Sequence, residues 1–182
     1  MALELNGSSQ YVKVADDGYG IFDKQSFSVC AWVYIATMKD GVIFSYDNTN
    51  HIAPYYAIQL RIKVESIILF GFNISGSYKY VLTGADLSTS KWHHIVATFT
   101  SGSQKVYIDN VEKGSGTESG TITFYHREAR IGDSPNFDGV FSGYIADVRF
   151  YDRALSLAEI QAIYSPQTRG SDNIVNGLVG DG

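Results

Sequence analysis

The feature that most constrains the fold is an alternation of apolar and polar side chains with a period of two. Along residues 55–64, the side chains that share one strand face are Tyr56, Ile58, Leu60, Ile62 and Val64. The opposite face carries Gln59, Arg61 and Lys63. A helix would scatter both sets around its circumference, whereas a strand places one set against a core and the other in solvent. The segment is therefore predicted to be a half-buried strand.

Short runs of β-branched and aromatic residues recur along most of the chain. Further strands are predicted at about 10–14, 27–35, 42–46, 66–72, 78–82, 92–100, 104–108, 121–125 and 144–151. Turn clusters rich in Gly, Asp and Ser separate many of these runs, and 113–120 is expected to be a flexible turn. Many short strands with little helix predict an all-β, two-sheet antiparallel sandwich.

One segment departs from this pattern near the carboxyl end. Ser156 and Glu159 have the spacing of a capping box, and Leu155 is placed to pack against Ile160. A short helix is predicted near 156–164. The polar sequence that follows favours a single domain over residues 1–165. Residues 166–182 then form a tail, either a final strand or the start of a following module.

Charge and hydropathy exclude several classes of partner. The 182 residues contain 14 Lys and Arg against 19 Asp and Glu, a formal net charge of −5. Nucleic acid binding relies on a field of basic side chains, so no nucleic-acid partner is expected. The longest apolar stretch, around 67–70, is far shorter than the roughly 18 residues of a membrane span. The single cysteine, Cys30, is expected to be a small buried hydrophobic residue.

Several stretches resemble one known family. Residues 92–99, 105–110 and 141–156 are similar to strand signatures of laminin G-like, concanavalin A-like lectin–glucanase jelly rolls, and 3–12 and the strand through Trp32 fit the same family. The resemblance extends over about 3–165 and includes pentraxins as relatives. It implies a jelly-roll sandwich. This family includes lectins, adhesion modules, glycan hydrolases and structural domains, so the function has to be argued from a site.

Catalytic chemistry is not expected. Glycan hydrolysis requires two carboxyl groups roughly 5 to 9.5 Å apart. Hydrolases that share the resemblance carry closely spaced acids on one strand, and no glutamate here has an acidic residue two positions along a strand. His93 and His94 are adjacent on a predicted strand and point to opposite faces, so the pair cannot chelate one ion. Both are predicted to be structural. The chain is therefore not expected to be an enzyme.

Two oxygen-rich segments are candidates for a calcium site. Calcium takes six to eight oxygen ligands, which Asp and Asn supply. Asp47 and Asn48 follow the strand at 42–46 and look like the pentraxin Asp-Asn pair that binds calcium. The other candidates follow Ile131 and are Asp133, Asn136 and Asp138. Their segment departs from the acid-amide-acid run of that family. The alternative is that both segments are polar turns that bond to their own backbone.

Asp147 is a separate candidate ligand. It shares a strand face with Ile145 and Arg149, so its carboxylate requires either that arginine or a metal as a partner. In related jelly rolls, an acid on the final strand often holds a structural calcium. Both possibilities stay open.

Sugar recognition generally requires exposed aromatic rings next to polar groups. Candidate ligand-binding rings near the acidic segments are Tyr46, Tyr55, Tyr125 and Phe137, and Tyr78 and Tyr80 share another strand face. The alternative is that these rings fill the faces of the sandwich.

The leading hypothesis is a non-catalytic, extracellular or surface-associated recognition module. It would bind a glycan or glycoprotein, with calcium as a possible cofactor, as one part of a multidomain protein. The alternative is a structural or protein-interaction module, as in an adhesin or a viral or phage surface protein.

Overall fold

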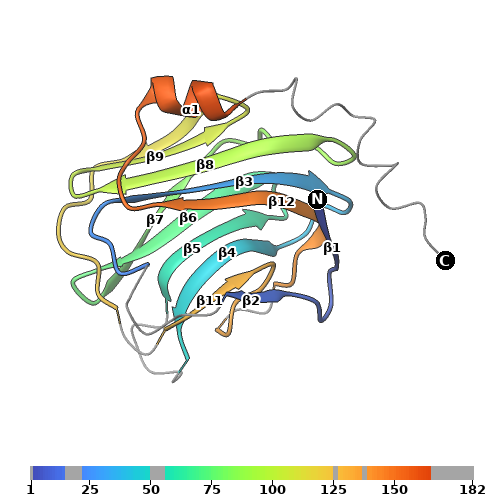
Figure 1. The fold of residues 1–182 in the computed structure, drawn as a ribbon, viewed down its shortest axis with the longest axis horizontal. Helices are drawn as coiled ribbons and strands as arrows, with labels where there is room; N and C mark the ends of the chain where they lie inside the picture. The colour runs from blue at the N-terminus through green and yellow to red at the C-terminus, as the bar shows by residue number, and fades with distance from the viewer. Residues whose placement is uncertain (1, 15–21, 50–55, 125–126, 137–138, 165–182) are drawn as a thin grey trace.

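Two six-stranded antiparallel sheets make up the structure, a computed structural model that describes residues 2–14, 22–49, 56–124, 127–136 and 139–164. The first sheet has the order β1 (Ala2–Asn6), β12 (Ser142–Tyr151), β3 (Phe27–Ile35), β8 (Trp92–Thr100), β9 (Ser103–Ile108) and β10 (Val111–Gly116). The second has the order β2 (Val12–Val14), β11 (Arg127–Ile131), β4 (Gly41–Asn48), β5 (Tyr56–Lys63), β6 (Ile67–Ile74) and β7 (Ser77–Leu82). The predicted two-sheet sandwich is confirmed (Figure 1).

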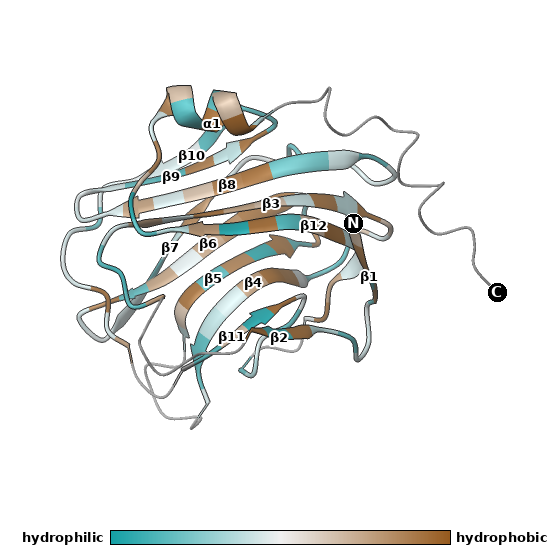
Figure 2. Ribbon diagram, viewed as in Figure 1, coloured by the Kyte–Doolittle hydropathy of each residue, from teal (hydrophilic) through white to brown (hydrophobic). Residues whose placement is uncertain are grey.

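The core lies between the sheets and is rich in aromatic rings. Phe27 on β3 stacks on Phe99 of β8, with ring centroids 5.3 Å apart. It also meets the edge of Phe70, on β6 of the opposite sheet, at 6.1 Å. Alternation along each strand supplies one apolar face per sheet, and stacking those faces removes both from water. Brown, apolar stretches accordingly lie along the strands of both sheets (Figure 2).

Among the described residues, one short helix, α1 (Leu157–Ile163), covers part of the outer face of the first sheet, beside β8 and β9 (Figure 1). The predicted capping box is confirmed: Ser156 and Glu159 each bond to the other's backbone amide. Leu155 and Ile160 join Cys30, Val96 and Tyr107 in a small second cluster. Cys30 is buried, as predicted, and burial raises the pKa of its thiol to about 12.

Three local predictions were wrong or incomplete. Residues 121–124 form no strand and contribute one isolated bridge, from Ile122 to Ile74. The first half of the glycine-rich run 113–120, which was expected to be a flexible turn, instead belongs to β10. A Cβ atom at Gly114 would lie 2.6 Å from the Leu82 carbonyl oxygen, so glycine permits close approach to β7. Strand β11 was also not predicted. The domain end near 165 and the tail at 166–182 lie at or beyond the last described residue and stay predictions.

Candidate functional site

The two predicted oxygen-rich segments lie against each other on the outer face of the second sheet. Strand β11 pairs antiparallel with β4, which places Ile131 opposite Phe44. The segment 132–136 then turns back along β4. Ser45 Oγ donates to the Asp133 carbonyl at 2.8 Å, and Asn136 Nδ2 donates to the Asn48 carbonyl at 2.5 Å. The topology therefore juxtaposes segments that are about 90 residues apart in the sequence.

Asp47 anchors this contact from below. Asp47 was predicted to follow the strand, but β4 continues to Asn48 and includes it. Its carboxylate is fully buried. Oδ2 accepts hydrogen bonds from Ser134 Oγ at 2.6 Å and from Gln59 Nε2 at 3.0 Å. Among the described residues, no side chain donates to its Oδ1. Burial raises the pKa of Asp47 to about 7, and the bonds from Ser134 and Gln59 only partly oppose that rise.

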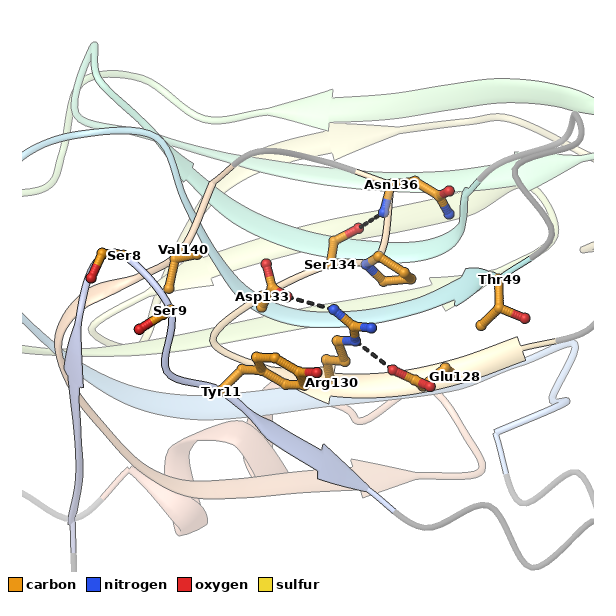
Figure 3. Close-up of a pocket in the computed structure, with 11 residues that line it drawn as sticks. Ser8, Ser9, Tyr11, Thr49, Glu128, Arg130, Asp133, Ser134, Asn136 and Val140 are labelled. Carbon is orange, nitrogen blue, oxygen red and sulfur yellow. Dashed lines mark hydrogen bonds and ion pairs between the residues drawn. The ribbon is translucent and has the colours of Figure 1, made fainter.

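An open pocket of about 650 Å³ lies above this network. It is lined by Ser8, Ser9, Tyr11, Thr49, Glu128, Arg130, Asp133, Ser134, Pro135, Asn136 and Val140. Arg130 lies between two carboxylates: Nε donates to Glu128 at 2.5 Å and Nη1 to Asp133 at 2.6 Å (Figure 3). The Tyr11 ring faces the guanidinium at 4.4 Å from its centroid. The pocket therefore has a rigid, charged floor and walls rich in hydroxyl and amide groups.

The charges on this floor stabilise one another. Burial alone would lower the pKa of Arg130, but its hydrogen bonds to Glu128 and Asp133 outweigh burial and raise it. Burial alone would likewise raise the pKa of Glu128, but bonds from Lys13 and Arg130 lower it. Both groups consequently stay ionised at neutral pH.

The described residues do not form a calcium site at this place. Calcium requires six to eight oxygens that are free to face it. Here Asp133 already binds Arg130, and Oδ2 of Asp47 is occupied by two donors. No group of three or more His, Cys, Asp or Glu side chains that could hold a metal occurs in the described part of the chain. Asp138, the remaining predicted ligand, lies outside the described residues.

Asp147 has the arginine partner that its position requires. It sits at a bulge in β12 with φ of 53°, and its two oxygens accept from Arg149 Nε at 2.8 Å and Nη2 at 2.9 Å. The hydrogen bonds that Arg149 donates to Asp147 are the main cause that raises the pKa of Arg149. Of the two open alternatives, the ion pair is the one observed. A metal at Asp147 stays an untested prediction.

Of the predicted sugar-binding rings near the acidic segments, Tyr46 is the one that lies in the described part of the chain, and it does not line the pocket. Tyr46 was expected outside the core but is fully buried, because β4 directs it inward against Phe22, and its hydroxyl donates to Asp23 at 2.8 Å. Tyr46 is therefore corrected to a core residue. Tyr55, Tyr125 and Phe137 lie outside the described residues.

Sequence reasoning missed the residues at the centre of the pocket. Glu128 and Arg130 are two apart on one strand, so their shared face was a usable signal once β11 was recognised as a strand. Tyr11 gave no such signal, because it meets Arg130 across more than a hundred residues.

A second aromatic surface lies beside the pocket segment. Tyr78 and Tyr80 share a face of β7, as predicted, with centroids 6.1 Å apart, and Tyr56 on β5 lies 5.2 Å from Tyr78. The Tyr78 hydroxyl reaches Gln59 at 3.5 Å, and a Cβ at Gly71 would lie 2.1 Å from that oxygen. Glycine at 71 is what allows the approach. We call Tyr56, Tyr78 and Tyr80 the tyrosine stripe.

His93 has contacts that resemble a catalytic triad in distance alone. Its Nδ1 lies 2.7 Å from Asp109 Oδ2, and Ser88 Oγ lies 3.3 Å from its Nε2. The Ser88 backbone N–H also donates to Nε2, at 3.1 Å. The Nε2 lone pair of His93 is therefore directed at the backbone N–H of Ser88 as well as near its hydroxyl. His94 instead packs on Trp32, with centroids 4.9 Å apart. Both histidines are structural, as predicted.

Comparison with known proteins identifies the class. A laminin G model described as the Concanavalin A-like lectin/glucanases superfamily matches residues 6–161. The chain belongs to this family. Among the described residues, no helix is long and apolar enough to cross a membrane.

Individual relatives are distant. The adhesion G-protein coupled receptor V1 of Danio rerio is 23% identical over 161 residues, which are 85% of this chain and 3% of the receptor. The pentraxin-related protein PTX3 of Mus musculus is 26% identical over 152 residues, 76% of this chain and 38% of that protein. The chain thus spans well under half of either relative.

One solved structure illustrates the shared fold. The CBM40 of the Ruminococcus gnavus IT-sialidase, bound to α2,3 sialyllactose, superposes with a TM-score of 0.78. The match covers 90% of this chain and 96% of that one at 11% identity. At this identity, the likeness establishes the fold alone.

Proposed function

We propose that this chain is a non-catalytic recognition module that binds carbohydrate in the pocket between Tyr11 and segment 132–136. The observation that carries the proposal is the pocket itself. Its floor holds a fixed arginine between two carboxylates, and Ser8, Ser9, Thr49, Ser134 and Asn136 contribute hydroxyl and amide groups to its lining.

This lining matches the chemistry of a sugar. Sugar hydroxyls both donate and accept hydrogen bonds, and planar guanidinium and carboxylate groups offer such bonds in fixed directions. Because Glu128 and Asp133 hold Arg130 in place before any ligand arrives, little order would be lost on binding. Tyr11, at 41% exposure, offers ring surface at the rim for an apolar sugar face.

The same electrostatics argue against glycan hydrolysis. A glycosidase requires one carboxyl with a raised pKa as a proton donor. The pocket carboxylate Glu128 has a lowered pKa because Lys13 and Arg130 bond to it. Asp47 has the raised pKa, but it is fully buried beneath the pocket. Glu128 is therefore not suited to donate a proton to a glycosidic bond, and the described lining gives no support to an enzymatic role.

The relatives support a role outside or at the surface of a cell, within a larger protein. One of them is an adhesion receptor of which this chain corresponds to 3%. The carbohydrate-binding module with the same fold is bound to a sialylated sugar. Calcium stays a prediction, and the proposed binding mode requires no metal from the described residues.

Glycan-array binding, with and without a chelator, tests the proposal. We expect one or more glycans to bind under both conditions. Tyr11→Ala should weaken that binding about fivefold, because a cation–π and stacking contact contributes about 1 kcal/mol. Tyr144→Ala, on the first sheet, is the matched control and should bind normally.

Failure of every glycan to bind at high protein concentration, in both conditions, would overturn the proposal. Binding that is lost only in the presence of the chelator would instead support a calcium-dependent site. Some of the calcium ligands would then lie outside the described residues.

A protein-interaction role is the second candidate. Tyr80 and Leu82 on the edge strand β7 are 55% and 43% exposed and offer apolar surface to a partner at this edge. Light scattering of the purified chain tests self-association, and Tyr80→Glu should abolish any that involves this edge.

A further inference from the structure

We infer that the pocket selects uncharged oligosaccharides over those that carry a carboxylate. This inference rests on the proposed function and names the ligand class of the same site. It follows from how the charged groups of the floor are already paired.

The charges on the pocket floor cancel. Arg130 binds both Glu128 and Asp133, and Lys13 binds Glu128 from the neighbouring strand β2. Two cations thus face two anions among the described residues. An incoming carboxylate would meet no net positive field, and the whole chain carries a net charge of −5. Nothing in this balance steers an acidic sugar to the site.

The guanidinium is also engaged on several sides. Nε and Nη1 donate to Glu128 and Asp133, and the Tyr11 ring covers one face. A ligand carboxylate that approached Arg130 would therefore come close to two fixed carboxylates. Their side chains are only 12% and 13% exposed, so water screens the repulsion weakly. Like charges at such range cost more than one added hydrogen bond returns.

The rest of the lining favours neutral groups. Ser8, Ser9 and Thr49 present hydroxyls around the charged floor, and the carboxylates of Glu128 and Asp133 accept from hydroxyl donors. A neutral sugar can donate to these carboxylates without repulsion. The site thus has the acceptors that a polyol requires and lacks the unpaired cation that an acid requires.

This specificity differs from that named for the carbohydrate-binding module of the same fold, which holds α2,3 sialyllactose. The fold leaves room for such a difference, because the two chains are 11% identical and the site residues are set locally.

Calorimetric titration of matched glycan pairs tests the inference. The pairs are the neutral glycans that bind on the array and the same glycans with a terminal sialic acid, starting with lactose and 3′-sialyllactose. We expect each acidic partner to bind at least about tenfold more weakly.

Two variants sharpen the test. Asp133→Asn removes one carboxylate from the floor and frees a guanidinium N–H, so the preference for the neutral partner should narrow about tenfold or reverse. Asp86→Asn makes the same change of net charge at the Asp86–Lys113 pair, away from the pocket, and should leave the preference unchanged.

Three results are distinguishable. A preference for the neutral glycan that becomes smaller in Asp133→Asn but not in Asp86→Asn supports the inference. Equal or tighter binding of the acidic partners overturns it and leaves the proposed function intact. Failure of every glycan to bind overturns the proposed function and this inference with it.

Discussion

Asp133 and Ser134 are neighbours in the sequence and both line the pocket, yet their side chains join different polar networks. Asp133 binds Arg130 at 2.6 Å on the floor of an open pocket. Ser134 Oγ donates at 2.6 Å to Asp47, whose carboxylate is fully buried. One short segment thus takes part in a buried polar network beneath the pocket and in the ion-pair cluster that forms the pocket floor.

The predicted acidic segments therefore have two roles. The network of Asp47, Gln59 and Ser134 fixes where segment 132–136 lies. The cluster of Arg130, Glu128 and Asp133 then lines the pocket. Access to the pocket separates the two roles, because the Asp47 carboxyl lies fully buried beneath it, whereas Glu128 and Asp133 line it.

The largest expected effect is the pH dependence that Asp47 gives to stability. Its pKa is about 7 in the folded protein against an ordinary 3.8, so the folded state binds the proton more tightly. Its contribution is therefore fully present below about 3.8 and is lost as pH rises through about 7. Urea unfolding should show the native protein losing about 3 kcal/mol relative to Asp47→Asn between pH 4.5 and 7.5. Parallel pH profiles for the two proteins would contradict this.

Loss of Ser134 should be the next largest effect. Ser134→Ala removes a hydrogen bond to a buried carboxylate, which typically costs about 2 kcal/mol of unfolding free energy at pH 8. Ser9→Ala, at an exposed position of the same pocket, should change it by less than about 0.5 kcal/mol. If the two variants are equally stable, segment 132–136 is not anchored by this bond.

A smaller effect is expected in the open cluster. Arg130→Lys keeps the charge but cannot hold Glu128 and Asp133 with a planar fork, so about 1 kcal/mol should be lost. Arg153→Lys makes the same substitution at the exposed pair with Glu159 and should leave stability almost unchanged. Thermal and urea unfolding together measure both, and an Arg130→Lys variant as stable as Arg153→Lys would refute the ranking.

The smallest effect is expected at Asp147. Its ion pair with Arg149 is partly exposed, so Asp147→Asn should cost no more than about 0.5 kcal/mol. Added calcium should not raise the melting temperature of the native protein. A rise in the native protein that is absent from Asp147→Asn would restore the structural calcium that was predicted there.

Local patterns predicted much of the fold. The strand predicted over 55–64 and the capping box of Ser156 and Glu159 depend only on neighbouring residues, and both elements are confirmed. The predicted division into a core face and a solvent face was wrong at two positions, because Gln59 is fully buried and Val64 is 58% exposed. That Asp47 and segment 132–136 lie together was predicted from the family resemblance and not from a local pattern.

Strand pairing determined what the sequence did not reveal. Tyr46 is buried because it shares the inner face of β4 with Phe44, where Phe22 packs against both rings. Arg130 meets Tyr11 only because β11 lies between β2 and β4. Register between distant strands has no local signal, so the centre of the pocket could not be predicted.

The most direct test of carbohydrate recognition at this pocket is a crystal structure of the chain with a neutral oligosaccharide that binds on the array. The account predicts a sugar ring against Tyr11, with hydroxyls bonded to Glu128, Asp133 or Asn136. A sugar bound instead on the tyrosine stripe or on the first sheet, with the pocket filled only by water, would contradict it.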